Sequence, residues 1–333
     1  MLPAALATIA SGAARADPVE DFYHGKTVTL YIGTTPGGGY DTYARLVARF
    51  LGAHIPGHPV ILPVNMPGAG GRTAAGHIYS IVAKDGLSLG SSDQALPLAQ
   101  AVGDTTIKFD TSKLNWIGST DSDNKVMVAW FTSGVKTIED ARREEVTMGA
   151  PAETTGPQYL NAMNVYAGTR FKVITGYPGI NETNLAMERG EVEGVGGTSW
   201  ATWKTKPDML RDHKINVLVQ VGFTKAPELQ DVPLLMELGS TPEADAVLKL
   251  LSAPIPIGHP IYTSPGVPAE RVNALRAAFD ETMKDPALLE EAKKIKLGID
   301  PTPGEKLQQI AADIQSAPQS VKDRLADIIL DHK

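Results

Sequence analysis

The chain has 333 residues, of which 42% are hydrophobic and 21% are charged, and its formal net charge is −7. This length exceeds what one compact core usually needs, so we expect two domains. No run of like charges indicates a nucleic-acid or membrane-surface partner, and the absence of cysteine excludes disulfides, thiolate metal sites and cysteine nucleophiles.

The N-terminus has the pattern of a secretory signal. An apolar stretch over residues 2–10 precedes the small-x-small triplet Ala14-Arg15-Ala16. We therefore expect residues 1–16 to be a signal peptide that is cleaved after Ala16, which leaves an exported, soluble chain. The usual positively charged start of such a signal is missing, and a disordered or helical tail is the alternative. No other segment approaches the roughly 18 consecutive apolar residues of a membrane span.

Strand-like and helix-like segments then alternate. Residues 27–32 and 60–64 are typical of strands, and a third short strand is expected at 87–89. Apolar residues at helical spacing predict helices over 40–51 and 74–82. This alternation predicts a parallel sheet with helices on its faces.

The same alternation returns later in the chain. Strands are expected at 126–131, 146–149, 171–175 and 215–221, with helices after Thr155-Gly156-Pro157 and over 182–189. The alternation breaks at residues 121–124, and a buried strand ends at Val221. We therefore expect a discontinuous first lobe (17–120 plus 222–333) and a second lobe (121–221).

A glycine-rich turn follows the first expected strand. It consists of Thr34, Thr35, Pro36, Gly37, Gly38, Gly39, Tyr40 and Asp41. Consecutive glycines allow a close approach of backbone to ligand, and free N–H groups at a helix start suit an anion. Asp41 could instead cap the helix. Taken alone, the turn fits a ligand site and a simple tight turn equally well.

A second glycine-rich turn follows the second expected strand. Its candidate ligand residues are Asn65, Pro67, Gly68, Ala69 and Gly70. The turn narrowly misses the dinucleotide fingerprint, because Thr73 occupies the third glycine position. Two such turns on successive parallel strands would line one crevice.

The second lobe offers hydroxyls, amides and aromatic rings that would suit a carboxylate and its carbon skeleton. The candidates are Thr154, Thr155, Gly156, Tyr177, Thr198, Ser199 and Trp200. For Trp200 and Trp203 simple core packing is the alternative, and we favour a pocket role only for Trp200.

These segments resemble the periplasmic receptors of tripartite tricarboxylate transporters, often called Bug-type solute-binding proteins. The resemblance rests on segments spread over nearly the whole chain after residue 16. They are residues 36–41 with Ala44-Arg45-Leu46 behind them, residues 65–71, Asp85-Gly86 before Leu87-Ser88-Leu89, Tyr177-Pro178-Gly179 and Gly190-Glu191-Val192-Glu193-Gly194. The chain departs from the family at Thr34-Thr35, where a Phe-Pro pair is common, and in the loop around Trp200.

The resemblance implies a type II periplasmic-binding fold with two lobes hinged around a ligand cleft. It also implies that backbone amides and ordered water hold a small organic carboxylate, a di- or tricarboxylate or a related acid. Membrane transporter subunits would be the partners. We expect a monomer without a cofactor, with lobes that close on the ligand.

An exported α/β enzyme acting on a small carboxylic acid is the alternative. His54 and His58 have the spacing of metal ligands on a helix, but Pro56 and Gly57 between them favour a surface loop. Neither a nucleophile elbow nor a zinc-protease motif is present. We therefore expect a binding protein without catalytic or metal-binding residues.

Overall fold

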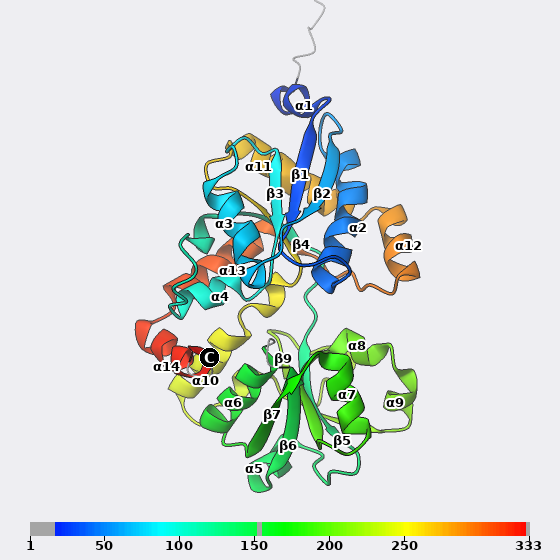
Figure 1. Ribbon diagram of the computed structural model, residues 1–333, viewed down its shortest axis with the longest axis vertical. Helices are drawn as coiled ribbons and strands as arrows, with labels where there is room; N and C mark the ends of the chain where they lie inside the picture. Colours follow the sequence, from blue (N-terminus) through cyan, green and yellow to red (C-terminus); the bar gives the residue numbers. More distant parts are fainter. Residues whose placement is uncertain (1–16, 152–154, 331–333) are drawn as a thin grey trace, which may run out of the picture.

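The computed structural model describes residues 17–151 and 155–330, and it consists of two lobes stacked along the long axis of the molecule (Figure 1). Each lobe has one central sheet with helices on both faces. The expected α/β class with two lobes is confirmed. Within the two described ranges, no helix combines the length and apolar character needed to cross a membrane.

The first lobe is built on a six-stranded sheet. Its strands lie in the order β11 (Thr302–Pro303), β4 (Asn115–Ser119), β10 (Pro260–Thr263), β3 (Ser88–Ser91), β1 (Thr27–Ile32) and β2 (Val60–Asn65). As expected, β1 is parallel to β2 and β3, but β10 runs antiparallel to both β3 and β4. The sheet is therefore mixed, because β10 enters it from the side of the second lobe.

Helices cover both faces of the first sheet. One face carries α1 (Pro18–Tyr23), α2 (Gly39–His54), α11 (Ala269–Thr282) and α12 (Pro286–Lys294), and the other carries α3 (Arg72–Ser80), α4 (Leu96–Ala101) and α13 (Gly304–Ser316). The buried side chains of α2 include Ala44, Val47 and Leu51, which follow one another at helical spacing. This stripe fixes the axis of α2 against the sheet and so fixes where its N-terminus lies.

The second lobe is built on a five-stranded sheet. Its strands lie in the order β7 (Phe171–Tyr177), β6 (Val146–Pro151), β8 (Gly194–Ser199), β5 (Lys125–Trp130) and β9 (Ile215–Val221). The helices of this lobe are α5 (Ile138–Arg143), α6 (Gly156–Tyr166), α7 (Ile180–Glu188), α8 (Trp200–Lys204) and α9 (Pro207–Arg211). Strands β6, β7 and β8 are mutually parallel in direction, so their carboxyl ends share one edge.

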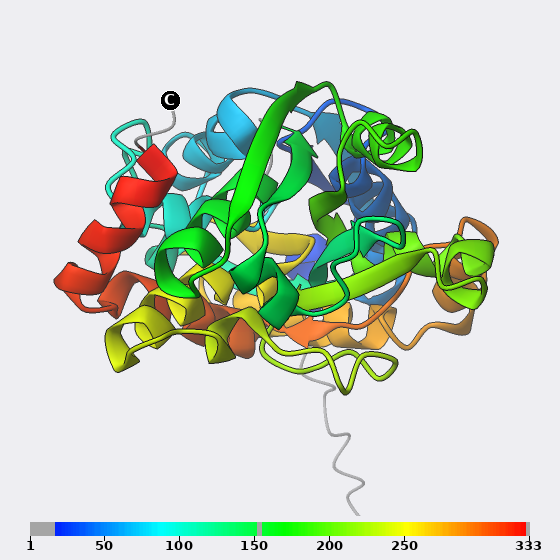
Figure 2. The same ribbon diagram turned by 90° about the horizontal axis from the view of Figure 1, so that it is seen from below.

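The chain does not return to the first sheet at Val221 as expected. The next strand of that sheet, β10, begins only at Pro260. Before it, α10 (Pro242–Ser252) packs on α6 and on the C-terminal helix α14 (Gln319–Leu330), and α14 also contacts α6 (Figures 1 and 2). Part of the segment 222–333, which we expected in the first lobe, therefore lies against the second.

Buried Gln220 explains the late return. Its side-chain oxygen accepts hydrogen bonds from the amide of Asn124 (2.9 Å) and the N–H of Ala226 (2.8 Å). Its nitrogen donates to the carbonyls of Leu229 (2.8 Å) and Val232 (2.9 Å). A buried amide whose donors and acceptor are all used holds its partners firmly. Gln220 therefore ties the segment after β9 to the second sheet.

Candidate functional site

The two glycine-rich loops meet at one edge of the first sheet. A Cβ added to Gly33, at the end of β1, would lie 2.8 Å from the Cα of Gly71 and 3.1 Å from the Oγ of Ser92. Such a distance leaves no room for any side chain at residue 33. The loops after β1, β2 and β3 therefore touch one another, at the edge that faces the second lobe (Figure 1).

Asp41 fastens the first loop to the second. Its buried carboxylate accepts hydrogen bonds from the Gly37 N–H (2.8 Å), the Asn65 amide (2.7 Å) and the Arg45 guanidinium (2.9 Å). The Asn65 amide also donates to the carbonyl of Thr34 (2.9 Å). Asp41 and Asn65, both candidate ligand residues, are therefore occupied in holding the loops together.

The carboxylate of Asp41 leaves the first turn of α2 uncapped. The N-cap is Gly38, which has no side chain to accept the free N–H groups. Among the described residues, none accepts a hydrogen bond from the N–H groups of Gly38, Gly39 or Tyr40. A Cβ added to Gly37 or Gly38 would meet nothing within 4 Å. The backbone at residues 37 and 38 is therefore open, and the helix dipole favours an anion beside these donors.

The second loop presents a similar set of amides. Gly68, Ala69 and Gly70 are exposed and have positive φ angles of 142°, 47° and 62°. Within the described part of the chain their N–H groups also have no acceptor. The side chain of Arg72 lies beside this turn, where it donates to Asp104 (2.5 Å) and to the carbonyl of Ala69 (2.8 Å). The remaining loop candidates Thr35, Pro36 and Pro67 are exposed, and the Thr34 hydroxyl is buried with no partner in the described residues.

A third loop belongs to the same edge, and its role was not predicted from the sequence. It follows β3 and contains Ser92, Asp93 and Gln94. The hydroxyl of Ser92 bonds to the Gly71 carbonyl (3.2 Å), and the Gln94 N–H donates to the hydroxyl of Tyr40 (2.9 Å). The position of this loop after the third predicted parallel strand was the signal that could have revealed it.

The second lobe brings its candidates to the edge shared by β6, β7 and β8. Thr154 lies outside the described residues, while Thr155 and Gly156 begin α6 and Tyr177 ends β7. The hydroxyl of Thr198 is buried and has no partner among the described residues. An unmade hydrogen bond in a buried site costs about 1–3 kcal/mol, so this hydroxyl would gain from a ligand or water.

The two edges lie close enough to interact electrostatically. Burial raises the pKa of Tyr159 in α6 to about 12, a hydrogen bond with Thr155 opposes this rise, and the Asp93 carboxylate of the first lobe adds to it. The charge of Asp93 in the first lobe therefore reaches the hydroxyl of Tyr159 in the second lobe.

Ser199 and Trp200 differ from the expectation. The Ser199 hydroxyl donates to the carboxylate of Asp123. Trp200 is buried in the apolar core of the second lobe beside Trp203, and its indole N–H donates to Glu228 (3.2 Å). Trp200 therefore packs as in the core-packing alternative, because α8 directs its aromatic side chains into the core.

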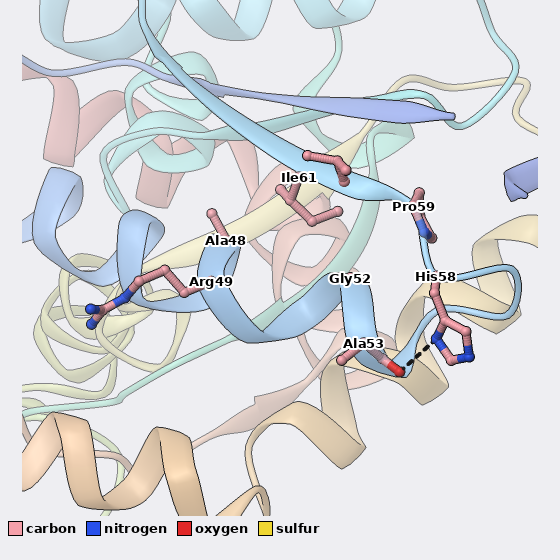
Figure 3. A pocket seen from close by; sticks show the side chains of 8 residues that line it. Ala48, Arg49, Gly52, Ala53, His58, Pro59 and Ile61 are labelled. Carbon is pink, nitrogen blue, oxygen red and sulfur yellow. Dashed lines mark hydrogen bonds between the residues drawn. The ribbon is translucent and has the colours of Figure 1, made fainter. Parts of the chain in front are cut away.

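Two surface hollows lie elsewhere. One of about 300 Å³ lies beside the C-terminal half of α2 and the start of β2, where His58 bonds to the carbonyl of Ala53 (2.9 Å; Figure 3). The other, of about 680 Å³, lies between α8–α9 and α12, and Lys204, Lys293 and Lys296 line it. Neither contains a candidate ligand residue. No group of three potential metal-ligating side chains occurs within residues 17–151 and 155–330.

Several solved structures are similar to this chain over most of its length. A TctC solute-binding protein from Polaromonas, solved without ligand, matches with a TM-score of 0.71 and 18% identity over 91% of this chain and 99% of its own. A protein from R. palustris solved with adipate matches with a TM-score of 0.61 and 18% identity over 91% and 97%. MatC from Rhodopseudomonas palustris, solved with malate, matches with a TM-score of 0.60 and 17% identity over 90% and 99%.

The chain has the fold of these solute-binding proteins. No protein-family model matches it, and no curated protein matches its sequence. At 17–18% identity the likeness establishes the architecture of a solute-binding protein, and the function has to be argued from the site.

The Asp41 network makes the stability of this solute-binding fold depend on pH. Burial raises the pKa of Asp41, but the hydrogen bonds from Gly37, Arg45 and Asn65 outweigh burial and hold the pKa below the usual value. A depressed pKa contributes stability that is present above the unfolded pKa of about 3.9 and is lost as pH falls through the folded pKa.

We predict that Asp41→Asn lowers the free energy of unfolding by about 1–2 kcal/mol near neutral pH, because charge-assisted hydrogen bonds are lost. Urea unfolding as a function of pH would measure this, and the difference from wild type should shrink below pH ~4. Asp208→Asn is the matched control, since Asp208 forms an exposed ion pair with Arg211 (2.8 Å) and should change little. Equal effects of the two changes would contradict the role of Asp41.

Proposed function

We propose that the chain is a periplasmic solute-binding receptor of the tripartite tricarboxylate transporter type. It captures a small organic carboxylate between its two lobes and delivers it to membrane transporter subunits. Residues 1–16, outside the described part, would direct export. The observation that carries this proposal is the set of unpaired, exposed N–H groups at the start of α2 and in the Gly68–Gly70 turn.

The ligand's carboxylate is held mainly by oriented backbone dipoles. The N–H groups of residues 38–40 and 68–70 lie on adjoining loops, and each can donate one hydrogen bond. The nearby guanidinium groups of Arg45 and Arg72 are engaged with Asp41 and Asp104. Backbone amides at a helix start bind anions without a salt bridge.

The second lobe completes the site when the lobes close. Its donors are the Thr198 hydroxyl, Tyr177 and the start of α6 at Thr155 and Gly156. Thr154 lies outside the described residues and stays a candidate from the sequence. A ligand that touches both lobes favours the closed form by the difference in its affinity for the two forms. The crossing segment between Ser119 and Lys125 and the segment before Pro260 are where the hinge would act.

The similar structures solved with adipate and malate make dicarboxylates the first compounds to test. The enzyme alternative differs in one observable, because an enzyme would convert the acid whereas a receptor returns it unchanged.

A thermal-shift screen against organic acids, followed by recovery of the acid, tests the proposal. We predict that at least one dicarboxylate raises the melting temperature, since a ligand at 100 times its Kd adds about 2.7 kcal/mol. Chromatography should then recover the acid unaltered. A panel of di- and tricarboxylates without any stabilising member would contradict carboxylate capture, and turnover of the acid would favour an enzyme.

We further predict that Gly38→Leu abolishes binding of the stabilising acid while the fold survives. Gly38 has an extended backbone (φ −80°, ψ 173°) that any residue can adopt, and its Cβ position is open. A leucine there would cover the amides. Isothermal titration calorimetry and circular dichroism would measure binding and folding.

Gly298→Leu is the matched control. The Cβ position of Gly298 is equally open, but this residue lines the hollow between α8–α9 and α12. Loss of binding in this variant alone would move the ligand site to that hollow.

A further inference from the structure

His259 lies beside the free amides of α2. It belongs to the short segment between the 3₁₀ turn Ile255–Ile257 and β10, where the chain re-enters the first sheet. Its ring stacks on Tyr43 with centroids 4.1 Å apart and lies 4.5 Å from the ring of Tyr40. The Nε2 atom is 3.3 Å from the position that a Cβ on Gly39 would occupy. One ring nitrogen of His259 is thus directed at the first turn of α2.

The other ring nitrogen is fixed by a carboxylate. Nδ1 of His259 is 2.5 Å from Oδ1 of Asp121, which lies on the outgoing crossing segment between β4 and β5. The carboxylate of Asp121 accepts a hydrogen bond from the Nδ1–H group of His259. This contact fixes both the orientation of the ring and the nitrogen that carries the hydrogen. Nε2 is left as the nitrogen that a ligand can use, and no residue in the described ranges hydrogen-bonds to it.

The immediate surroundings of His259 carry negative charge, and the described residues add one cation, Lys125, which acts on nearby Asp123: burial raises the pKa of that carboxyl group and Lys125 opposes the rise. Asp121 faces the ring directly, and Tyr40 and Tyr43 are the other titratable groups in contact with it. Burial raises the pKa of Tyr43, and the charges of Asp121 and Asp123 raise it further. Burial also raises the pKa of Tyr40, and the charge of Asp93 raises it further.

With neutral His259, the carboxylate of Asp121 repels an anionic ligand that approaches the ring. A proton on Nε2 removes that repulsion and creates a donor aimed at the ligand. The guanidinium groups of Arg45 and Arg72 are already paired with Asp41 and Asp104.

We propose that His259 is a ligand-binding residue and that capture of a carboxylate is coupled to uptake of a proton. The proton comes from solvent and binds Nε2, so that the imidazolium lies between Asp121 and the ligand's carboxylate. This inference rests on the proposed function and names the side chain that supplies positive charge to the ligand-binding site. Linkage then requires binding to weaken as pH rises, by at most about tenfold per pH unit.

Isothermal titration calorimetry with adipate and with malate tests the inference. Titrations near neutral pH, in buffers of different ionisation enthalpy, report how many protons are taken up. Both probes are fully ionised there, because carboxyl groups ionise near pH ~4. We expect the wild type to take up as much as about one proton per ligand. His259→Gln should bind about ten- to hundredfold more weakly and take up none.

His54→Gln is the matched control. His54 also pairs with a carboxylate, Asp285 (3.0 Å), but it lies at the opposite end of α2, about 22 Å along the helix. This variant should bind and take up protons like the wild type.

Unchanged affinity and unchanged proton uptake in His259→Gln would overturn the role of His259 and leave the proposed receptor function intact. Absence of uptake in the wild type would overturn the coupling even if the variant failed to fold. A wild type that binds neither adipate nor malate would overturn proton-coupled capture of these dicarboxylates, whereas the proposed receptor function falls only if the wider acid panel also contains no stabilising member.

Discussion

The arrangement of the candidate site depends on one buried carboxylate. Asp41 accepts hydrogen bonds from the loop after β1 and from Asn65 at the end of β2, and by doing so it draws two glycine-rich turns into contact. Because its oxygens take the Gly37 N–H and not those of residues 38–40, the first turn of α2 stays open. The same interaction that stabilises the loops therefore leaves their amides available to a ligand.

The way the lobes are joined constrains how they can move. One apolar core cluster includes Trp116 and Leu307 of the first lobe and Leu160 of the second, with residues of α10 and α14 among its members. A continuous core of this kind resists opening. The hollow lined by α8–α9 and α12 marks a side where the lobes are less tightly packed. We therefore expect a hinge motion that widens this side and pivots about the shared core, with Asp121 and His259 on two of the segments that cross between the lobes.

The sequence predicted the parts that depend on local pattern. Strand–turn–helix spacing placed β1, β2 and β3 and both glycine loops, because alternating burial and consecutive glycines are visible in the chain. It did not reveal β8, since Gly196 and Gly197 look like turn residues. A side chain on Gly196 would collide with Leu160 of α6, and one on Gly197 would collide with Gly156 of the same helix. The late return after Val221 depends on the partners of Gln220, and the pairing of His259 with Asp121 spans 138 residues. Such contacts are set by tertiary packing, which periodicity does not encode.

The central claim is that unpaired amides of the first lobe hold the ligand's carboxylate. A crystal structure of the protein with a stabilising dicarboxylate tests it most directly. The account predicts one carboxylate within hydrogen-bonding distance, about 3 Å, of the N–H groups of Gly38, Gly39 or Tyr40. A ligand bound instead among Lys204, Lys293 and Lys296, with these amides facing only solvent, would contradict it.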